Sequence, residues 1–230
     1  MFELPDLVVF DLDNTIYEYA PCNKIAQSHL SEYLSELYGM SGSELNKSLA
    51  AARKLVKKRI EGASSHSRHL YVSEFLHTKG IKLDPNTLLE AAERYWSAFL
   101  SKMQLAPGVI DLLTSLRYRQ IPIALVSDLT LEIQYRKLVR LGVDSFFDFI
   151  VVSEETTLDK QSFRPFDLLI ERLNGREYKS VWFIGDCEAD FPRNFPASSI
   201  KYILSPFSNL KKTQQLENIK SFKDLSRLIR

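Results

Sequence analysis

Cysteine is scarce in this sequence of 230 residues, where Cys22 and Cys187 are the only two. They lie far apart in the chain, so we expect two reduced thiols rather than a disulfide framework or a cysteine-ligated zinc site. An excess of one charge is also lacking, because 30 Lys and Arg residues stand against 29 Asp and Glu residues and leave a formal net charge of +1. This balance argues against a nucleic-acid or membrane partner.

Long apolar runs are missing as well. No stretch approaches the length that spans a membrane, and residues 1–6 lack the basic start and apolar run of a signal peptide. We therefore expect a cytoplasmic protein, either a monomer or a homodimer. Core-forming residues are abundant, since 45% of the chain is hydrophobic. That supply suits one domain with an elaboration, or two small domains.

The stretch Leu-Val-Val-Phe-Asp-Leu-Asp-Asn-Thr at residues 7–15 ends unlike an ordinary strand. Its four apolar residues predict a buried strand, and Asp11 and Asp13 follow where that strand should end. Two residues apart on an extended backbone, both carboxylates point to the same side. Crowded carboxylates repel unless a cation lies between them or their pKa values are pushed apart. The plain alternative is a turn in which Thr15 caps the next helix.

Residues 17–104 show helical periodicity without a strand signal, so we expect a self-contained insertion of four helices there. Gly39 ends the first of these helices, Ser41 opens the second and Asp84 opens the fourth.

From residue 107 onward strands and helices alternate, which predicts an α/β fold with a parallel sheet and helices on both faces. The predicted strands are 121–126, 149–152, 181–184 and 201–204, and the predicted helices are 109–119, 131–141, 165–173 and 222–229.

Polar residues stand at the ends of several predicted strands. Ligands of such sheets bind outside the carboxyl ends of the strands. We therefore expect four residues that are distant in sequence to meet in one crevice: Asp11, Asp13, Ser127 and Asp186.

Four short polar segments stand in order along the chain, each at a predicted strand end or helix. They are Asp11-Leu-Asp-Asn-Thr15, Ser127, Lys160 and Gly185-Asp-Cys-Glu-Ala-Asp190. With them the chain resembles the haloacid dehalogenase (HAD) superfamily, and within it the aspartate-nucleophile phosphatases that carry a helical cap after the first strand. The resemblance covers essentially the whole chain. It implies a Rossmann-like core at 1–16 and 105–230 and an all-helical cap at 17–104.

The resemblance also implies a mechanism and a cofactor. Asp11 would be the nucleophile that forms an aspartyl-phosphate, and Asp13 would act first as general acid and then as general base. Mg²⁺ prefers oxygen ligands and would take them from Asp11, the backbone carbonyl of Asp13 and Asp186. Asp190 would bind the ion directly or through a water. As plain alternatives, Asp186 and Asp190 form a turn and a helix start.

Phosphate binding falls to a second group of residues. Thr15 and Ser127 would donate their hydroxyl protons to the phosphoryl oxygens. Asp128, next to Ser127, is expected to take part in substrate binding. Lys160 would supply a positive charge, although Arg164 lies close enough in the sequence to replace it. An ordinary loop opening at Ser127 and a solvated Lys160 are the plain alternatives.

The chain departs from the family pattern in two places. Gln161 stands where proline usually follows the lysine, and Phe-Pro-Arg-Asn-Phe-Pro at 191–196 replaces a turn that usually contains glycine. We expect the second change to alter packing beside the metal site and to leave the ligands in place.

Substrate choice is expected to lie with the cap, because the core motifs contact only phosphate and metal. The basic residues of segment 53–59 surround an apolar stripe, so a solvated face explains them, and at most they attract anionic substrates. His66, Arg68 and His69 are expected in a loop, for which a solvated surface is the favoured interpretation.

The expected function is Mg²⁺-dependent hydrolysis of a small phosphomonoester, either a sugar phosphate or a nucleotide. A haloacid dehalogenase also uses an aspartate nucleophile, but it needs neither a metal nor an acid for the leaving halide. A phosphomutase stays open if the phosphoryl group passes to a second hydroxyl. A non-catalytic binding protein is disfavoured because no catalytic position has decayed, and a receiver domain because it lacks a helical insertion.

Overall fold

The computed structural model describes residues 4–192, 194–211 and 216–229. The chain folds as two compact units, one formed by Met1–Glu18 with Gln104–Arg230 and the other by Tyr19–Met103.

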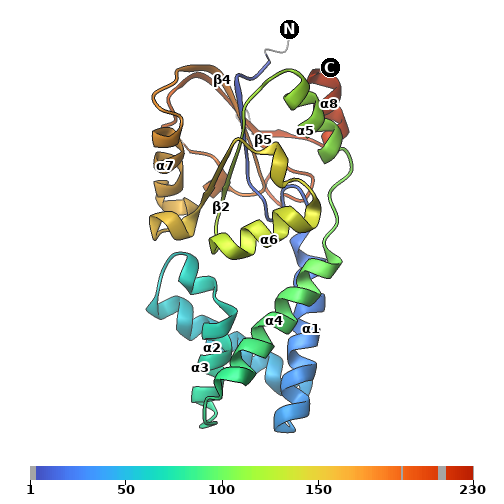
Figure 1. The fold of residues 1–230 in the computed structure, drawn as a ribbon, viewed down its shortest axis with the longest axis vertical. Coiled ribbons are helices and arrows are strands. Elements are labelled where there is room, and N and C mark those ends of the chain that lie inside the picture. Colours follow the sequence, from blue (N-terminus) through green and yellow to red (C-terminus); the bar gives the residue numbers. More distant parts are fainter. Residues whose placement is uncertain (1–3, 193, 212–215, 230) are drawn as a thin grey trace. The chain divides into compact units, whose positions relative to one another are not determined.

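A six-stranded parallel sheet forms the centre of the first unit (Figure 1). The strand order is β3-β2-β1-β4-β5-β6, which places β1 between two neighbours. Because β1 is covered on both faces, all four of its apolar residues are buried, as the unbroken apolar run predicts. The strands are β1 (Leu7–Phe10), β2 (Ile123–Ser127), β3 (Phe149–Val152), β4 (Tyr178–Gly185), β5 (Ala197–Leu204) and β6 (Leu216–Asn218).

The predicted α/β sheet with helices on both faces is confirmed. Figure 1 shows α7 on one side of the sheet and α5 and α8 on the other. Phe166 and Leu169 of α7 pack against Val126 of β2 and Phe183 of β4. The helices of this unit are α5 (Val109–Tyr118), α6 (Leu131–Leu141), α7 (Arg164–Arg172) and α8 (Phe222–Ile229).

The strand predictions need three corrections. Strand β2 starts two residues later than predicted and includes Ser127. Strands β4 and β5 start earlier than predicted, because Tyr178 and Ala197 already pair with each other before the continuous apolar segments begin. Strand β6 was not predicted, since Leu-Glu-Asn has no apolar pattern and forms a strand only by pairing with β5.

Four helices build the second unit: α1 (Tyr19–Tyr38), α2 (Gly42–Arg59), α3 (Arg68–Thr78) and α4 (Pro85–Lys102). The Ser41 side chain accepts a hydrogen bond from the backbone N–H of Glu44 at 3.3 Å, and Asp84 accepts one from that of Thr87 at 2.9 Å, so both predicted caps are confirmed.

The expected loop at residues 66–69 is wrong for Arg68 and His69. Helix α3 begins at Arg68, because the Ser67 side chain caps it by accepting a hydrogen bond from the backbone N–H of Leu70. Arg68 and His69 therefore lie in the first helical turn.

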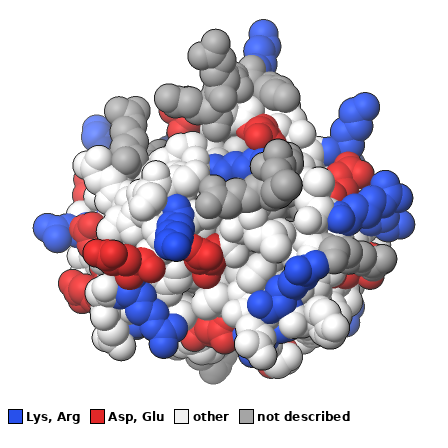
Figure 2. Space-filling view, turned by 90° about the horizontal axis from the view of Figure 1, so that it is seen from above, with Lys and Arg blue, Asp and Glu red and all other residues white. Residues whose placement is uncertain are grey.

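The charges and the helices agree with the expectations from composition. Acidic and basic side chains are interspersed on the face shown in Figure 2. Among the described residues, no helix is both long and apolar enough to cross a membrane.

Candidate active site

A buried ion-pair cluster lies at the carboxyl ends of the central strands of the first unit. Asp11 follows β1 directly, and Lys160 and Asp190 come from single 3₁₀ turns, Lys160–Ser162 and Glu188–Asp190. The ammonium nitrogen (Nζ) of Lys160 donates to Oδ1 of Asp11 at 2.5 Å and to Oδ1 of Asp190. All three side chains are at most 5% exposed. One buried ammonium thus bridges two buried carboxylates.

This arrangement shifts the pKa values of its members. Burial raises the pKa of Asp11 well above its usual value, and the charge of Asp190 raises it further while Lys160 opposes the rise. For Lys160, burial lowers the pKa, but attraction to Asp11 and Asp190 outweighs burial and leaves it raised. Lys160 therefore stays charged beside Asp11. One further positive charge would balance the cluster.

The arginine proposed as a substitute for Lys160 lies elsewhere. Arg164 has a side chain that is 67% exposed and pairs with Asp167 at 3.9 Å. Of the two candidates, only Lys160 reaches Asp11.

Asp13 is held by two groups, Lys137 and Tyr17, and the sequence analysis did not identify Lys137. Nζ of Lys137, a fully buried residue of α6, donates to the two carboxylate oxygens at 2.7 and 2.8 Å. The hydroxyl of Tyr17 donates to Oδ1. The Asp13 side chain is 26% exposed, so it keeps access to solvent while its position is fixed.

The residues expected to bind phosphate have different surroundings. Thr15 is buried, and its hydroxyl donates to Oδ2 of Asp11 at 2.8 Å, so in this structure it orients that carboxylate. Ser127 accepts a hydrogen bond from the Gln134 side-chain amide at 2.6 Å, which leaves the hydroxyl proton of Ser127 available for donation. Asp128 accepts from the backbone N–H of Lys160 at 2.8 Å and so anchors the turn that carries the lysine.

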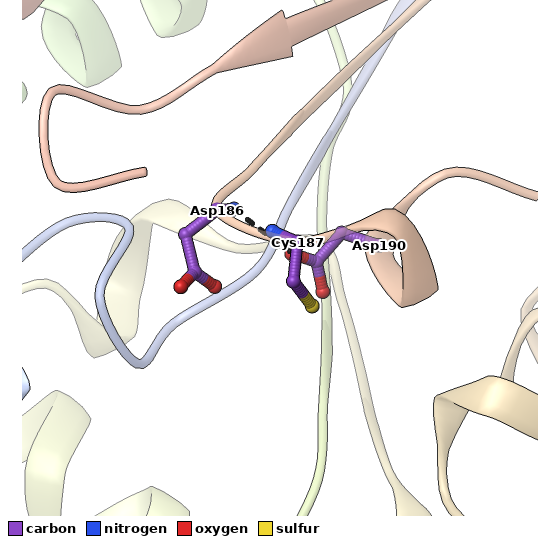
Figure 3. Close-up of side chains that lie close together, drawn as sticks. All are labelled: Asp186, Cys187 and Asp190. Carbon is purple, nitrogen blue, oxygen red and sulfur yellow. Dashed lines mark hydrogen bonds between the residues drawn. The ribbon is translucent and has the colours of Figure 1, made fainter. Parts of the chain in front are cut away.

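The segment after β4 gathers the remaining candidate ligands. Asp186, Cys187 and Asp190 place their ligand atoms within 4.8 Å of one another. Figure 3 shows the three side chains extending from this segment in the same general direction, with hydrogen bonds from the backbone N–H groups of Asp186 and Cys187 to the Asp190 carboxylate. Both of these bonds reach Oδ2 of Asp190 and measure 2.9 Å.

Asp186, Cys187 and Asp190 differ in how well they can donate to a metal, because their hydrogen bonds and pKa values differ. Both oxygens of Asp190 accept hydrogen bonds, Oδ1 from Lys160 and Oδ2 from the two backbone N–H groups. Burial, and next the charge of Asp190, raises the pKa of Asp186 to about 6. Burial also raises the pKa of the Cys187 thiol to about 12, so the thiol stays protonated and is a poor metal ligand. The Asp186 carboxylate is thus the best metal donor of the three.

Gly185 makes this geometry possible. A Cβ atom added there would lie 2.4 Å from the Cβ of Asp190 and 2.5 Å from its Oδ2. Only glycine allows the Asp190 side chain to approach the end of β4 this closely.

Comparison with known proteins agrees with this geometry. The model of the haloacid dehalogenase-like hydrolases matches residues 5–192. The chain belongs to this family.

Named relatives of this HAD-like hydrolase are phosphatases. A ribulose-1,5-bisphosphate 5-phosphatase of Halopiger xanaduensis is 36% identical over 185 residues, which cover 80% of this chain and 77% of the relative. A glyceraldehyde 3-phosphate phosphatase of Methanocaldococcus jannaschii is 25% identical over 181 residues, covering 78% and 75%.

The fold likewise matches a solved structure. The HAD-hydrolase YfnB of Bacillus subtilis, bound to magnesium, aligns over 97% of both chains with a TM-score of 0.68 and 19% sequence identity. At that identity the likeness concerns the fold alone.

The two departures from the family pattern have separate consequences in this HAD-like hydrolase. Gln161 is exposed, and the adjacent Lys160 keeps its bond to Asp11 without a following proline. Phe191 and Phe195 are buried and pack against Tyr202 and Phe183 respectively, so these two rings form part of the core.

Proposed function

We propose that this HAD-like hydrolase is a Mg²⁺-dependent phosphatase that hydrolyses a small phosphomonoester through an aspartyl-phosphate on Asp11. The observation that carries the proposal is the contact between Lys160 and Asp11, together with Asp13 two residues further on. This arrangement brings two carboxylates and a positive charge together at one end of the sheet, which supports the proposed roles. The relatives named as phosphatases support the same reaction class.

In the first step, a carboxylate oxygen of Asp11 attacks phosphorus and the bond from phosphorus to the ester oxygen breaks. Thr15 and Lys160 fix the Asp11 carboxylate through one hydrogen bond to each of its oxygens. The Lys160 ammonium offsets negative charge that gathers on the phosphoryl oxygens, and Ser127 donates its hydroxyl proton to one of them. Asp13 supplies the proton that the leaving alkoxide takes up.

In the second step, Asp13 removes a proton from a water, whose oxygen attacks phosphorus and displaces the Asp11 carboxylate. Free enzyme and inorganic phosphate result, and Asp13 is protonated again for the next cycle. The two hydrogen bonds from Lys137 and the one from Tyr17 keep Asp13 in a single orientation for both transfers.

The donor set suits magnesium. Hard oxygen ligands are available from Asp11, the backbone carbonyl of Asp13 and Asp186. The thiol of Cys187 is protonated and therefore binds softer metals poorly. The excess of buried carboxylate over ammonium calls for a further cation. A magnesium ion held by these oxygens would offset negative charge on the phosphoryl oxygens. Asp190 contributes by holding the backbone of Asp186 and Cys187.

The helical unit Tyr19–Met103 is proposed to act as a cap that selects the ester and excludes water. Because the named relatives act on phosphorylated sugars of three and five carbons, a small sugar phosphate is the favoured substrate over a nucleotide.

Carbon–halogen hydrolysis is the main alternative, because it uses the same nucleophile. A halide leaves without a proton, so that reaction gives no role to the three hydrogen bonds that hold Asp13. Phosphoryl transfer to a second hydroxyl, as in a mutase, needs the same groups as hydrolysis.

A substrate panel tests the proposal. Sugar phosphates, nucleotides and a 2-haloacid are assayed with Mg²⁺ and with EDTA, for the unaltered protein and for Asp11→Asn. We expect phosphate release from a sugar phosphate that needs both Mg²⁺ and Asp11. Halide release without metal would replace the proposal with the dehalogenase, and an isomerised phosphate ester would replace it with the mutase.

A further inference from the structure

A pocket of about 560 Å³ lies wholly within the helical unit, between side chains of α1, α2, α3 and α4. This volume is in the range of small-molecule sites, which run from roughly 300 to 1,000 Å³.

The lining of this pocket carries charge of one sign. Helix α2 contributes Arg53, Lys54, Lys57 and Lys58, and α3 contributes Arg68, while no lining residue is acidic. The spacing of the α2 residues places them along one helical face. The expectation of a plain solvated face is therefore incomplete, since four of the basic residues in segment 53–59 face a concave site. Arg59 instead pairs with Glu74 at 2.8 Å.

Arg68 is built into the wall of the pocket. Its guanidinium lies 4.4 Å from the ring centroid of Tyr95 and 5.1 Å from that of Trp96. It donates hydrogen bonds to the hydroxyls of Tyr95 at 2.7 Å and Tyr19 at 3.1 Å, and to the backbone carbonyl of His66 at 2.8 Å. These partners orient the guanidinium without neutralising its charge, which leaves it able to attract an anion.

The remaining lining combines apolar side chains, among them Leu30 and Leu49, with three side-chain amides that suit a polyol. Asn23, Gln27 and Asn46 offer amide donors and acceptors, and Asn23 is itself held by a hydrogen bond of 2.6 Å from the Tyr95 hydroxyl. Side-chain amides of this kind can form hydrogen bonds with sugar hydroxyls, and a cluster of Lys and Arg side chains can bind a phosphate group.

We propose that this pocket binds the phosphate group of a small sugar phosphate. The phosphate has two possible sources, the non-reacting phosphate of a bisphosphorylated substrate or a separate sugar phosphate that binds to the helical unit. The first source rests on the proposed phosphatase function and the second does not.

Binding is measured by calorimetry on full-length Asp11→Asn protein in EDTA, with ribulose 1,5-bisphosphate as the probe, so that no turnover is involved. The pocket variant adds Arg53→Gln and Lys57→Gln, and Arg68 is left intact because its ring contacts support the helical unit. The control adds Lys24→Gln and Lys47→Gln, which remove the same charge from exposed positions outside the pocket lining. Circular dichroism checks the fold of each protein.

The proposal expects the pocket variant to bind the probe at least about tenfold more weakly than the parent, which corresponds to about 1.4 kcal/mol, and the control to stay within about twofold. No binding to the parent, equal binding to the pocket variant, or equal weakening in the control would overturn it.

Steady-state kinetics identify the source of the bound phosphate. They compare the protein that carries Arg53→Gln and Lys57→Gln, with Asp11 intact, with the unaltered protein. An increase in KM for ribulose 1,5-bisphosphate with no change for ribulose 5-phosphate assigns the pocket to the second phosphate of the substrate. Unchanged KM values with weakened calorimetric binding assign it to a separate ligand. Absence of turnover of every phosphate ester in the panel by the unaltered protein would refute the proposed phosphatase and leave the binding result standing.

Discussion

Lys137 places its ammonium nitrogen 2.7 and 2.8 Å from the two carboxylate oxygens of Asp13, although 124 residues separate them in the sequence. The lysine is fully buried, whereas Asp13 is partly open to solvent. A buried ammonium needs its carboxylate, and a carboxylate held at both oxygens by one group has a fixed direction. The ion pair is therefore expected to stabilise the fold, because it compensates the buried charge of Lys137. It is also expected to support the reaction, because it orients Asp13.

Replacement of Asp13 by asparagine is expected to destabilise the protein by about 3 kcal/mol, because the buried ammonium of Lys137 loses the charge of Asp13. Urea denaturation measures the loss. The double variant Asp13→Asn with Lys137→Met should recover most of it, since the buried ammonium is then removed together with the carboxylate. Equal instability of the single and double variants would show that the ion pair is not the cause.

Lys137→Met alone is expected to lower kcat about 10²-fold with little change in KM, because Asp13 loses the group that directs it while the phosphate-binding residues are untouched. Steady-state kinetics on the best ester of the panel gives both constants. A rise in KM at constant kcat would instead make Lys137 a substrate-binding residue.

Lys160→Met should reduce kcat by about 10²-fold, the effect of removing about 3 kcal/mol of charge stabilisation from the transition state. Arg164→Met is the matched control, because Arg164 is exposed and pairs with Asp167 across one helical turn. Its kcat should stay within about twofold of the unaltered protein. The opposite ranking of the two variants would assign the phosphoryl group to the arginine.

Gly185→Ala is expected to cost about 3 kcal/mol of stability and most of the activity, because the new methyl group overlaps the Asp190 side chain. Gly42→Ala is its control, since Gly42 lies at the start of α2, where an added Cβ meets nothing within 4 Å. Thermal unfolding should show a lowered Tm for the first variant and an unchanged or raised Tm for the second.

Binding of Mg²⁺ should weaken about tenfold between pH 7 and pH 5, because Asp186 has a pKa of about 6 and must lose its proton to bind a metal. The same shift affects metal-free stability. The folded protein retains a proton that the unfolded chain releases above its pKa of 3.8, so stability falls as pH rises from about 4 to about 6. Metal titrations at both pH values, repeated with Asp186→Asn, separate this group from the others. An equally strong pH dependence in the variant would exclude Asp186 as the cause.

The parallel sheet and the positions of Asp11, Ser127 and Asp186 at strand ends could be predicted because an unbroken apolar run followed by a polar residue is a local signal. Lys137 and Gln134 were not predicted, since a lysine on a helix is usually solvated. A signal was present, because both interrupt the buried face of α6 beside Ile133 and Leu138. The basic residues of α2 show a helical period. The sequence does not reveal that residues of α3 and α4 line the same pocket as these basic residues.

The most direct test of the account is a search for phosphate on Asp11. The protein is mixed with its best sugar phosphate and Mg²⁺, quenched in acid during turnover, and its peptides are examined by mass spectrometry. We expect one phosphoryl group on the peptide that contains Asp11, and none with Asp11→Asn. Steady phosphate release by Asp11→Asn, or a phosphoryl group on any other residue, would contradict the assignment of Asp11 as the nucleophile.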